Sequence, residues 1–299
     1  MDKWTVAVLA VAMSVQASGA EPAPGEKDWL GQHRDWQAQR LARLTAPEAW
    51  LSLVGLHWLS EGRYTLGRGE GVDIDLRQGP ERLGELAHGA EGWTLTLVDP
   101  AVASVDGQSV AQTQLKSDQP GPATLVRYGT GNFILIERDG RHALRVRDSA
   151  AETRTAFAGI ESFEPSLDWR IEARFEAYAE PRQIEVATVV GTLEAYANPG
   201  RAVFTVEGRE YSLDALLEPG ATDYFFIVGD RTNGKESYGM ARYLYAAPPA
   251  DGKIVLDFNR LYNPPCAFTA FATCPMPPPQ NRLDLAIRAG EKKYLGPGH

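Results

Sequence analysis

The sequence is poor in the residues and short motifs on which most metal sites and covalent catalytic sites depend. It has two cysteines and five histidines in 299 residues. It contains no H-E-x-x-H, no C-x-x-C, no phosphate-binding G-x-x-x-x-G-K-[ST] and no G-x-S-x-G. These absences exclude the common zinc proteases, dithiol oxidoreductases, P-loop nucleotidases and nucleophile-elbow hydrolases. The histidines are scattered without ligand spacing, so we expect neither a metal site nor a cofactor.

An excess of basic charge is also absent. The chain has 30 lysines and arginines against 39 aspartates and glutamates, which gives a net charge of −9. Nucleic acids and anionic membranes are bound by clustered basic side chains that release counterions. We therefore expect no nucleic-acid partner, and the acidic balance favours solubility.

No apolar run reaches the length of about 20 residues that a spanning helix needs. The first twenty residues instead have the order of a secretory signal peptide: Lys3, the apolar run WTVAVLAVAM, and the small residues ASGA before Glu21. No cysteine follows Ala20, so a lipid anchor is not indicated. We expect cleavage after Ala20, no membrane insertion afterwards, and an exported protein that is periplasmic or secreted.

The rest of the chain predicts one helix followed by many short strands. The segment 27–45 has Trp29, Trp36 and Leu44 on one helical stripe, and Pro47 ends it. About a dozen later segments show the period of two and the turn-rich flanks of strands, among them HALRVR at 142–147, KIVLDFNR at 253–260 and LDLAIRA at 283–289. The predicted fold class is mainly β, with antiparallel sheets in sandwiches or barrels and one N-terminal helix.

We divide the chain at the polar stretch DSAAETRTAF, residues 148–157. The predicted parts are a signal peptide at 1–20, a leader and helix at 21–47, a β-sandwich region at 48–148 and a second β-rich region at 149–299. We expect Trp29 and Trp36 to pack against the sheet that contains WLSLVGLHWL, residues 50–59.

The stretch LGRGEGVDIDL, with Gly67, Arg68 and the later His88, resembles the core of forkhead-associated domains, which are β-sandwiches that bind phosphothreonine. The serine expected before the histidine is missing, and so is the Asn-Gly turn beyond it. The resemblance implies a sandwich topology for this region, without phosphopeptide binding.

Three longer stretches, WLSLVGLHWLSEG, YFFIVGDRTNGKESYGMARYLYA and DFNRLYNPPCAFTAFATCPMPPPQNRLDLAIRAGEKKY, resemble the family of unknown function DUF1684. The likeness runs from about Trp29 to Tyr294. It implies a β-rich domain with a C-terminal signature, and it implies no reaction.

The signature from Asp257 onward combines rigid prolines with charged and amide side chains, which suits a preorganised pocket. The alternative is a long loop strapped across a sheet, in which the same side chains only satisfy irregular backbone groups. Arginines in such a setting favour a carboxylate or phosphate ligand. The candidate ligand contacts are Asp257, Asn259, Arg260, Tyr262, Asn263, Asn281, Arg282 and Glu291, with Tyr238 and Arg242 from the preceding hairpin.

Cys266 and Cys274 are eight positions apart and are the only thiols. In an oxidising compartment this arrangement favours a disulfide. A nucleophilic thiolate would need a base, and no histidine is near in sequence. Metal ligation is the remaining alternative.

Three hypotheses about function remain open from the sequence. The first is an exported protein that binds a small acidic ligand in a pocket formed by the C-terminal signature. The second is a hydrolase-type enzyme that uses Asp257 or Glu291 as general base, and the third is a structural envelope protein without a pocket. The sequence names neither the ligand nor an oligomeric state.

Overall fold

The structure, a computed structural model, describes residues 24–296. Strands predominate, and the helix α1 (Pro24–Thr45) precedes them, so the predicted fold class is confirmed. The predicted signal peptide at 1–20 lies outside the described residues. No helix in the described part is long and apolar enough to cross a membrane.

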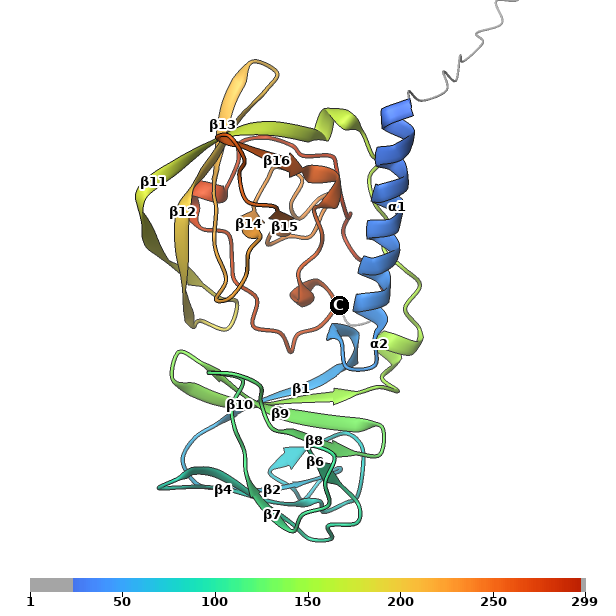
Figure 1. The fold of residues 1–299 in the computed structure, drawn as a ribbon. Coiled ribbons are helices and arrows are strands. Elements are labelled where there is room, and N and C mark those ends of the chain that lie inside the picture. Colours follow the sequence, from blue (N-terminus) through green and yellow to red (C-terminus); the bar gives the residue numbers. More distant parts are fainter. Residues whose placement is uncertain (1–23, 297–299) are drawn as a thin grey trace, which may run out of the picture.

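Residues 53–148 form a β-sandwich of two five-stranded sheets (Figure 1). One sheet has the order β1-β10-β9-β8-β6 and the other β3-β2-β4-β5-β7. Buried side chains from both sheets make one core, which includes Leu66, Leu95, Phe133 and Val146. The strands are β1 (Leu53–Leu59), β2 (Arg63–Gly67), β3 (Ile74–Asp75), β4 (Gly84–Gly89), β5 (Gly92–Leu97), β6 (Ser104–Val105), β7 (Gln112–Gln114), β8 (Leu125–Tyr128), β9 (Gly131–Arg138) and β10 (Arg141–Asp148).

Strand β10 places two arginines on the outer face of the sandwich, toward the second half of the chain. Side chains alternate between the two faces of a strand. Leu144 and Val146 therefore join the sandwich core, while Arg145 and Arg147 point out of the opposite face of the sheet. This outer face is covered by the second half of the chain, since Arg145 is only 4% exposed.

The second half of the chain, here called the C-terminal region (residues 170–294), contains a four-stranded antiparallel sheet of order β13-β12-β11-β16 and a two-stranded sheet β14-β15. Its largest core includes Phe204, Phe226, Leu256 and Phe258. The strands are β11 (Arg170–Ala187), β12 (Leu193–Val206), β13 (Arg209–Asp214), β14 (Tyr224–Val228), β15 (Arg242–Ala246) and β16 (Lys253–Asp257). The short helices before this region are η1 (Trp50–Ser52), α2 (Glu152–Thr155) and η2 (Leu167–Trp169). Those within it are η3 (Phe258–Arg260), η4 (Pro265–Ala267) and η5 (Pro279–Asn281).

Two strand predictions near the C-terminus are wrong. The predicted strand at 283–289 is irregular backbone, although Leu283 and Ile287 are buried in the core. Its carbonyl groups at 287 and 289 accept hydrogen bonds from the Arg242 guanidinium instead of from a neighbouring strand. The strand predicted at 253–260 ends at Asp257 and continues as the single turn η3.

The helix α1 lies along the C-terminal region and reaches the sandwich only at its end (Figure 1). The expectation that Trp29 packs against the sheet of residues 50–59 is wrong: its indole N–H donates to Asp257 at 3.1 Å. The last turn is anchored by Leu44, which packs with Leu51, Phe268 and Tyr294. The helix thus joins the start of the described chain to its end.

Candidate functional site

A cavity of about 900 Å³ lies where the sandwich, α1 and the C-terminal region meet. Its size falls in the range of small-molecule sites, roughly 300–1,000 Å³. Six arginines and four carboxylates line it, so its wall is positive although the whole chain is strongly negative. The wall is polar on the side of the sandwich and aromatic on the side of the C-terminal region.

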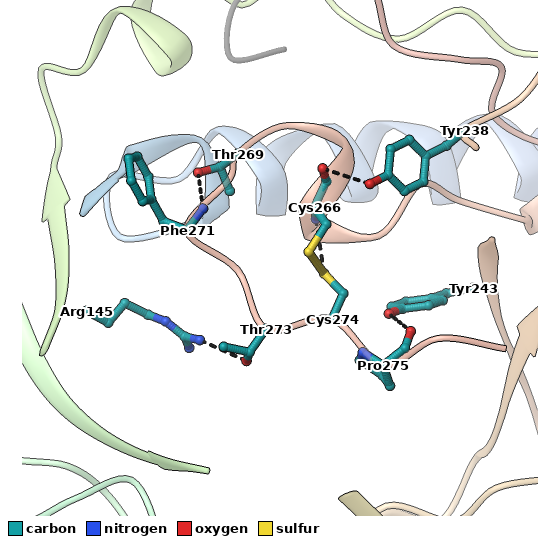
Figure 2. The surroundings of a disulfide bond; sticks show 9 residues. All are labelled: Arg145, Tyr238, Tyr243, Cys266, Thr269, Phe271, Thr273, Cys274 and Pro275. Atoms are coloured by element: carbon teal, nitrogen blue, oxygen red, sulfur yellow. Dashed lines mark hydrogen bonds between the residues drawn. A yellow bond between two sulfur atoms is a disulfide. The ribbon is translucent and has the colours of Figure 1, made fainter. Parts of the chain in front are cut away.

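Arg145 is the central side chain of the polar wall. It extends from β10 and donates one hydrogen bond to the Thr273 hydroxyl at 3.2 Å, as Figure 2 shows. Its Nε is buried and, within the described part of the chain, has no hydrogen-bond partner. Burial lowers the pKa of Arg145 to about 10, because the guanidinium loses its water and lies near Arg138 and Arg147. A buried cation is thus held here without a carboxylate partner.

The neighbouring arginines divide into paired and unpaired groups. Arg138 lies 2.9 Å from Asp118 and 3.6 Å from Glu194 of β12, and the latter contact joins the two halves of the chain. Arg147 makes no side-chain hydrogen bond or ion pair with any described residue, and burial lowers its pKa. Arg145 and Arg147 are therefore the arginines of the sandwich wall that form no ion pair with a described residue, and Asp118, Glu194 and Glu48 act on their pKa only from a distance.

The aromatic wall comes from one face of the β14–β15 sheet and the chain next to it. Phe225 stacks on Tyr245, with ring centroids 4.9 Å apart and an interplanar angle of 21°. Tyr262 continues the row beside Tyr245, and the Arg40 guanidinium lies 4.6 Å above its ring. Burial raises the pKa of Tyr243 and of Tyr262, so both hydroxyls stay neutral. This wall offers flat apolar surface to an organic ligand.

The disulfide-closed loop, residues 266–274, forms a further part of the cavity wall. Cys266 and Cys274 are bonded to each other, with Cα atoms 6.2 Å apart, so the predicted pairing is confirmed. The Tyr238 hydroxyl donates to the Cys266 carbonyl at 3.0 Å, and the Tyr243 hydroxyl donates to the Pro275 carbonyl at 2.8 Å (Figure 2). The loop therefore fixes Thr273, which in turn orients Arg145.

The double substitution Cys266→Ser, Cys274→Ser should lower the free energy of unfolding by about 2.5 kcal/mol, because the unfolded chain regains the freedom of the opened loop. Chemical denaturation of the oxidised wild type and of the variant measures this difference. Addition of a reductant should destabilise the wild type to the same extent and leave the variant unchanged. Equal stability of the oxidised wild type and the variant would contradict a structural role for the bond.

Two of the ten candidate ligand contacts, Arg260 and Tyr262, line the cavity. Arg260 lies 3.6 Å from Asp257 as an i,i+3 ion pair on η3. The other eight do not line it. Arg282 is exposed, and the remaining side chains are engaged in contacts that hold the C-terminal region together.

Three asparagines of the signature bind backbone groups. Asn259 accepts from the Ser166 N–H and donates to the Ser166 carbonyl, both at 2.9 Å. Asn281 does the same with both backbone groups of Asp214, at 2.7 and 3.0 Å. Asn263 donates to the Lys292 carbonyl at 2.8 Å. Each amide therefore takes the place of a strand neighbour for irregular backbone.

The two carboxylates considered as general bases accept hydrogen bonds from side chains of α1. Asp257 accepts from the Trp29 indole and from Asn259, while Glu291 accepts from Arg40 at 3.0 Å and from the Asn263 N–H at 2.6 Å. Both are buried. Their hydrogen-bonding capacity is used within the fold, away from the cavity.

Arg242 forms the most buried ion pair of the described chain. Its guanidinium and the Asp230 carboxylate are both 0% exposed and lie 2.7 Å apart. The same side chain donates to the carbonyl groups of Ile287 and Ala289. No group of three histidine, cysteine or acidic side chains suitable for a metal ion occurs among the described residues.

Sequence reasoning missed Arg138, Arg145 and Arg147. The signal is present in HALRVR, where arginines alternate with core residues on a strand. It predicts a charged outer face, and such a face is normally solvated. Only the packing of the C-terminal region over this sheet, far away in sequence, turns it into a cavity wall.

The family model described as "Protein of unknown function (DUF1684)" matches residues 155–292. The chain belongs to the DUF1684 family. The DUF1684 match covers the disulfide-closed loop and the aromatic wall, whereas α1 and the sandwich, with their arginines, precede it.

Comparison with solved structures finds the NMR structure of an uncharacterized protein of Haloarcula marismortui. It is 30% identical, with 46% of this chain and 78% of that chain covered and a TM-score of 0.40. Comparison with curated proteins gives no match.

Proposed function

We propose that this protein is an exported binding protein that holds a small organic anion in the cavity between its sandwich and its C-terminal region. The observation that carries the proposal is Arg145, a buried guanidinium in the cavity wall whose Nε lacks a partner among the described residues. A buried charge without a partner costs free energy, and such a cost persists where the charge has a use. A carboxylate or phosphate group would supply the missing acceptor.

The surroundings of Arg145 favour an organic rather than an inorganic anion. Arg147 adds a second guanidinium that forms no ion pair with a described residue, so the anion can be a bidentate or dianionic group. The stacked rings of Phe225 and Tyr245 line the same cavity and suit an apolar body. Its volume of about 900 Å³ leaves room for such a molecule.

Export is supported by two observations. The N-terminal pattern of residues 1–20 is that of a signal peptide. The disulfide between Cys266 and Cys274 suits an oxidising compartment. A periplasmic or secreted binding protein would account for the signal-peptide pattern, the disulfide and the cavity.

The proposal is tested by calorimetric titration with benzoate, phenyl phosphate and inorganic phosphate, and with benzyl alcohol as an uncharged analogue. Wild-type protein should bind the organic anions in preference to benzyl alcohol. Arg145→Met should weaken anion binding by about 10- to 100-fold, the value of one charge-assisted hydrogen bond. Arg141→Met is the matched control, because Arg141 is an exposed arginine of the same strand that does not line the cavity.

The ligand-free Arg145→Met variant should be more stable than the wild type, by about 1–3 kcal/mol, because a buried uncompensated charge is replaced by an apolar side chain. Thermal unfolding at low salt measures this gain. Failure of every anion to bind, or equal anion affinity of Arg145→Met and wild type, would overturn the proposed function.

A further inference from the structure

Charged side chains of both signs without an ion-pair partner among the described residues line the cavity, on different elements. Arg145 and Arg147, both on β10, form no ion pair with a described residue, and the exposed Arg43 of α1 is a third lining arginine without one. Glu218 and Asp223 also line the cavity, from the connection between β13 and β14. Neither carboxylate forms an ion pair with a described residue, and Glu218 accepts a hydrogen bond from the Tyr245 hydroxyl at 2.7 Å.

The two acidic side chains border the aromatic wall. Tyr245, whose hydroxyl donates to Glu218, stacks on Phe225, and the residue is 38% exposed. A cation placed between a carboxylate and aromatic faces gains both ion-pair and cation–π attraction. The same row of rings already holds one cation in this way, since Arg40 lies over Tyr262 and binds Glu291.

The arginine pair and the carboxylate pair do not neutralise each other. The carboxylates that bear on the pKa of Arg145 are Asp118 and Glu194, not Glu218 or Asp223. No nitrogen of Arg145 or Arg147 is within ion-pair distance of an acidic oxygen in the described chain, whereas Arg138 and Arg40 have carboxylate partners. One molecule with both kinds of charge would satisfy the two ends of the cavity together.

We infer that the ligand is a zwitterion, with its anionic group on Arg145 and Arg147 and an ammonium group beside Glu218, Asp223 and the ring of Tyr245. This inference rests on the proposed function, because it adds a second charged group to the anion that Arg145 binds. The competing role for Glu218 is to fix the Tyr245 hydroxyl. Glu218→Gln keeps an acceptor for that hydroxyl and removes only the charge.

The test uses unbranched alkanoates of increasing length, each compared with the amino acid that carries an ammonium on its terminal carbon. At the chain length that spans the cavity, the amino acid should bind about tenfold more tightly than its alkanoate. The double variant Glu218→Gln, Asp223→Asn should abolish this difference and should not weaken alkanoate binding. The variant Glu180→Gln, Glu185→Gln removes two exposed carboxylates of β11 outside the cavity and should behave as wild type.

The outcomes separate the two proposals. If alkanoates bind in an Arg145-dependent manner and no amino acid in the series binds more tightly, the ligand is a simple anion and the zwitterion inference is wrong. Survival of the amino-acid preference in the double variant would also overturn it. If neither series binds, this inference is wrong, and the proposed function fails with it only when benzoate and phenyl phosphate do not bind either.

Discussion

A chain that lacks residues 21–45 should lose about 5 kcal/mol or more of its free energy of unfolding. Trp29 is 6% exposed and Leu44 is 1% exposed, and burial of such side chains contributes about 1.5–3 kcal/mol each. Removal of α1 also takes the partners Trp29 and Arg40 from the buried carboxylates Asp257 and Glu291. The loss should therefore exceed the apolar contribution alone.

Chemical denaturation of the shortened chain measures this effect, and point variants keep the test informative if the shortened chain does not fold. Arg40→Met leaves Glu291 with a single neutral donor, the Asn263 N–H, and should cost about 2–4 kcal/mol. Gln39→Ala, an exposed position on the same helix, is the control and should change stability by less than about 0.5 kcal/mol. Coincident unfolding curves for shortened and full chains would show that α1 is an independent tail.

The substitution Asp230→Ala should lower the free energy of unfolding by about 3–5 kcal/mol, because it leaves Arg242 charged and buried. Burial already lowers the pKa of Arg242, and the adjacent Asp230 opposes that change. Asp230 also accepts a hydrogen bond from the Thr232 N–H at 2.7 Å. Without the carboxylate, the guanidinium that holds the carbonyl groups at 287 and 289 loses its counter-charge.

The matched control for Asp230→Ala is Asp284→Ala. Asp284 pairs with Arg209 and Arg231 at the surface, and exposed pairs contribute about 0–1 kcal/mol. Urea denaturation of both variants gives the comparison. Equal losses in the free energy of unfolding for the two substitutions would contradict a larger contribution of the buried pair to stability.

Local rules predicted much of the fold. The helix at 27–45, several strands of the sandwich such as the one at 142–147, and the cysteine pair follow from periodicity, turn residues and the count of thiols, and the structure confirms them. The segment 283–289 alternates like a strand, yet only its first residues pair with the backbone that follows β14, and its carbonyl groups at 287 and 289 are bound by the side chain of Arg242. Periodicity indicates which side chains are buried, but it does not indicate which groups form hydrogen bonds with the backbone N–H and C=O groups.

The candidate site was harder to predict than the fold. An asparagine such as Asn259 can bind a ligand or a peptide group, and only the position of Ser166, 93 residues away, decides between them. Arg145 is missed for the opposite reason: its strand is recognisable from the sequence, but a charged outer face of a strand normally meets solvent. Long-range packing therefore sets the chemistry of both positions, although each lies in a correctly located segment.

The binding of an anion by Arg145 is tested most directly by proton–nitrogen NMR of the arginine Nε–H groups, with the signals of Arg145, Arg147 and Arg141 assigned by single substitutions. Titration with phenyl phosphate should shift the Arg145 and Arg147 signals in a saturable manner with one shared dissociation constant. The signal of Arg141, outside the cavity, should not follow that curve. An unchanged Arg145 signal, or an equal linear drift of all three signals, would contradict anion binding in the cavity.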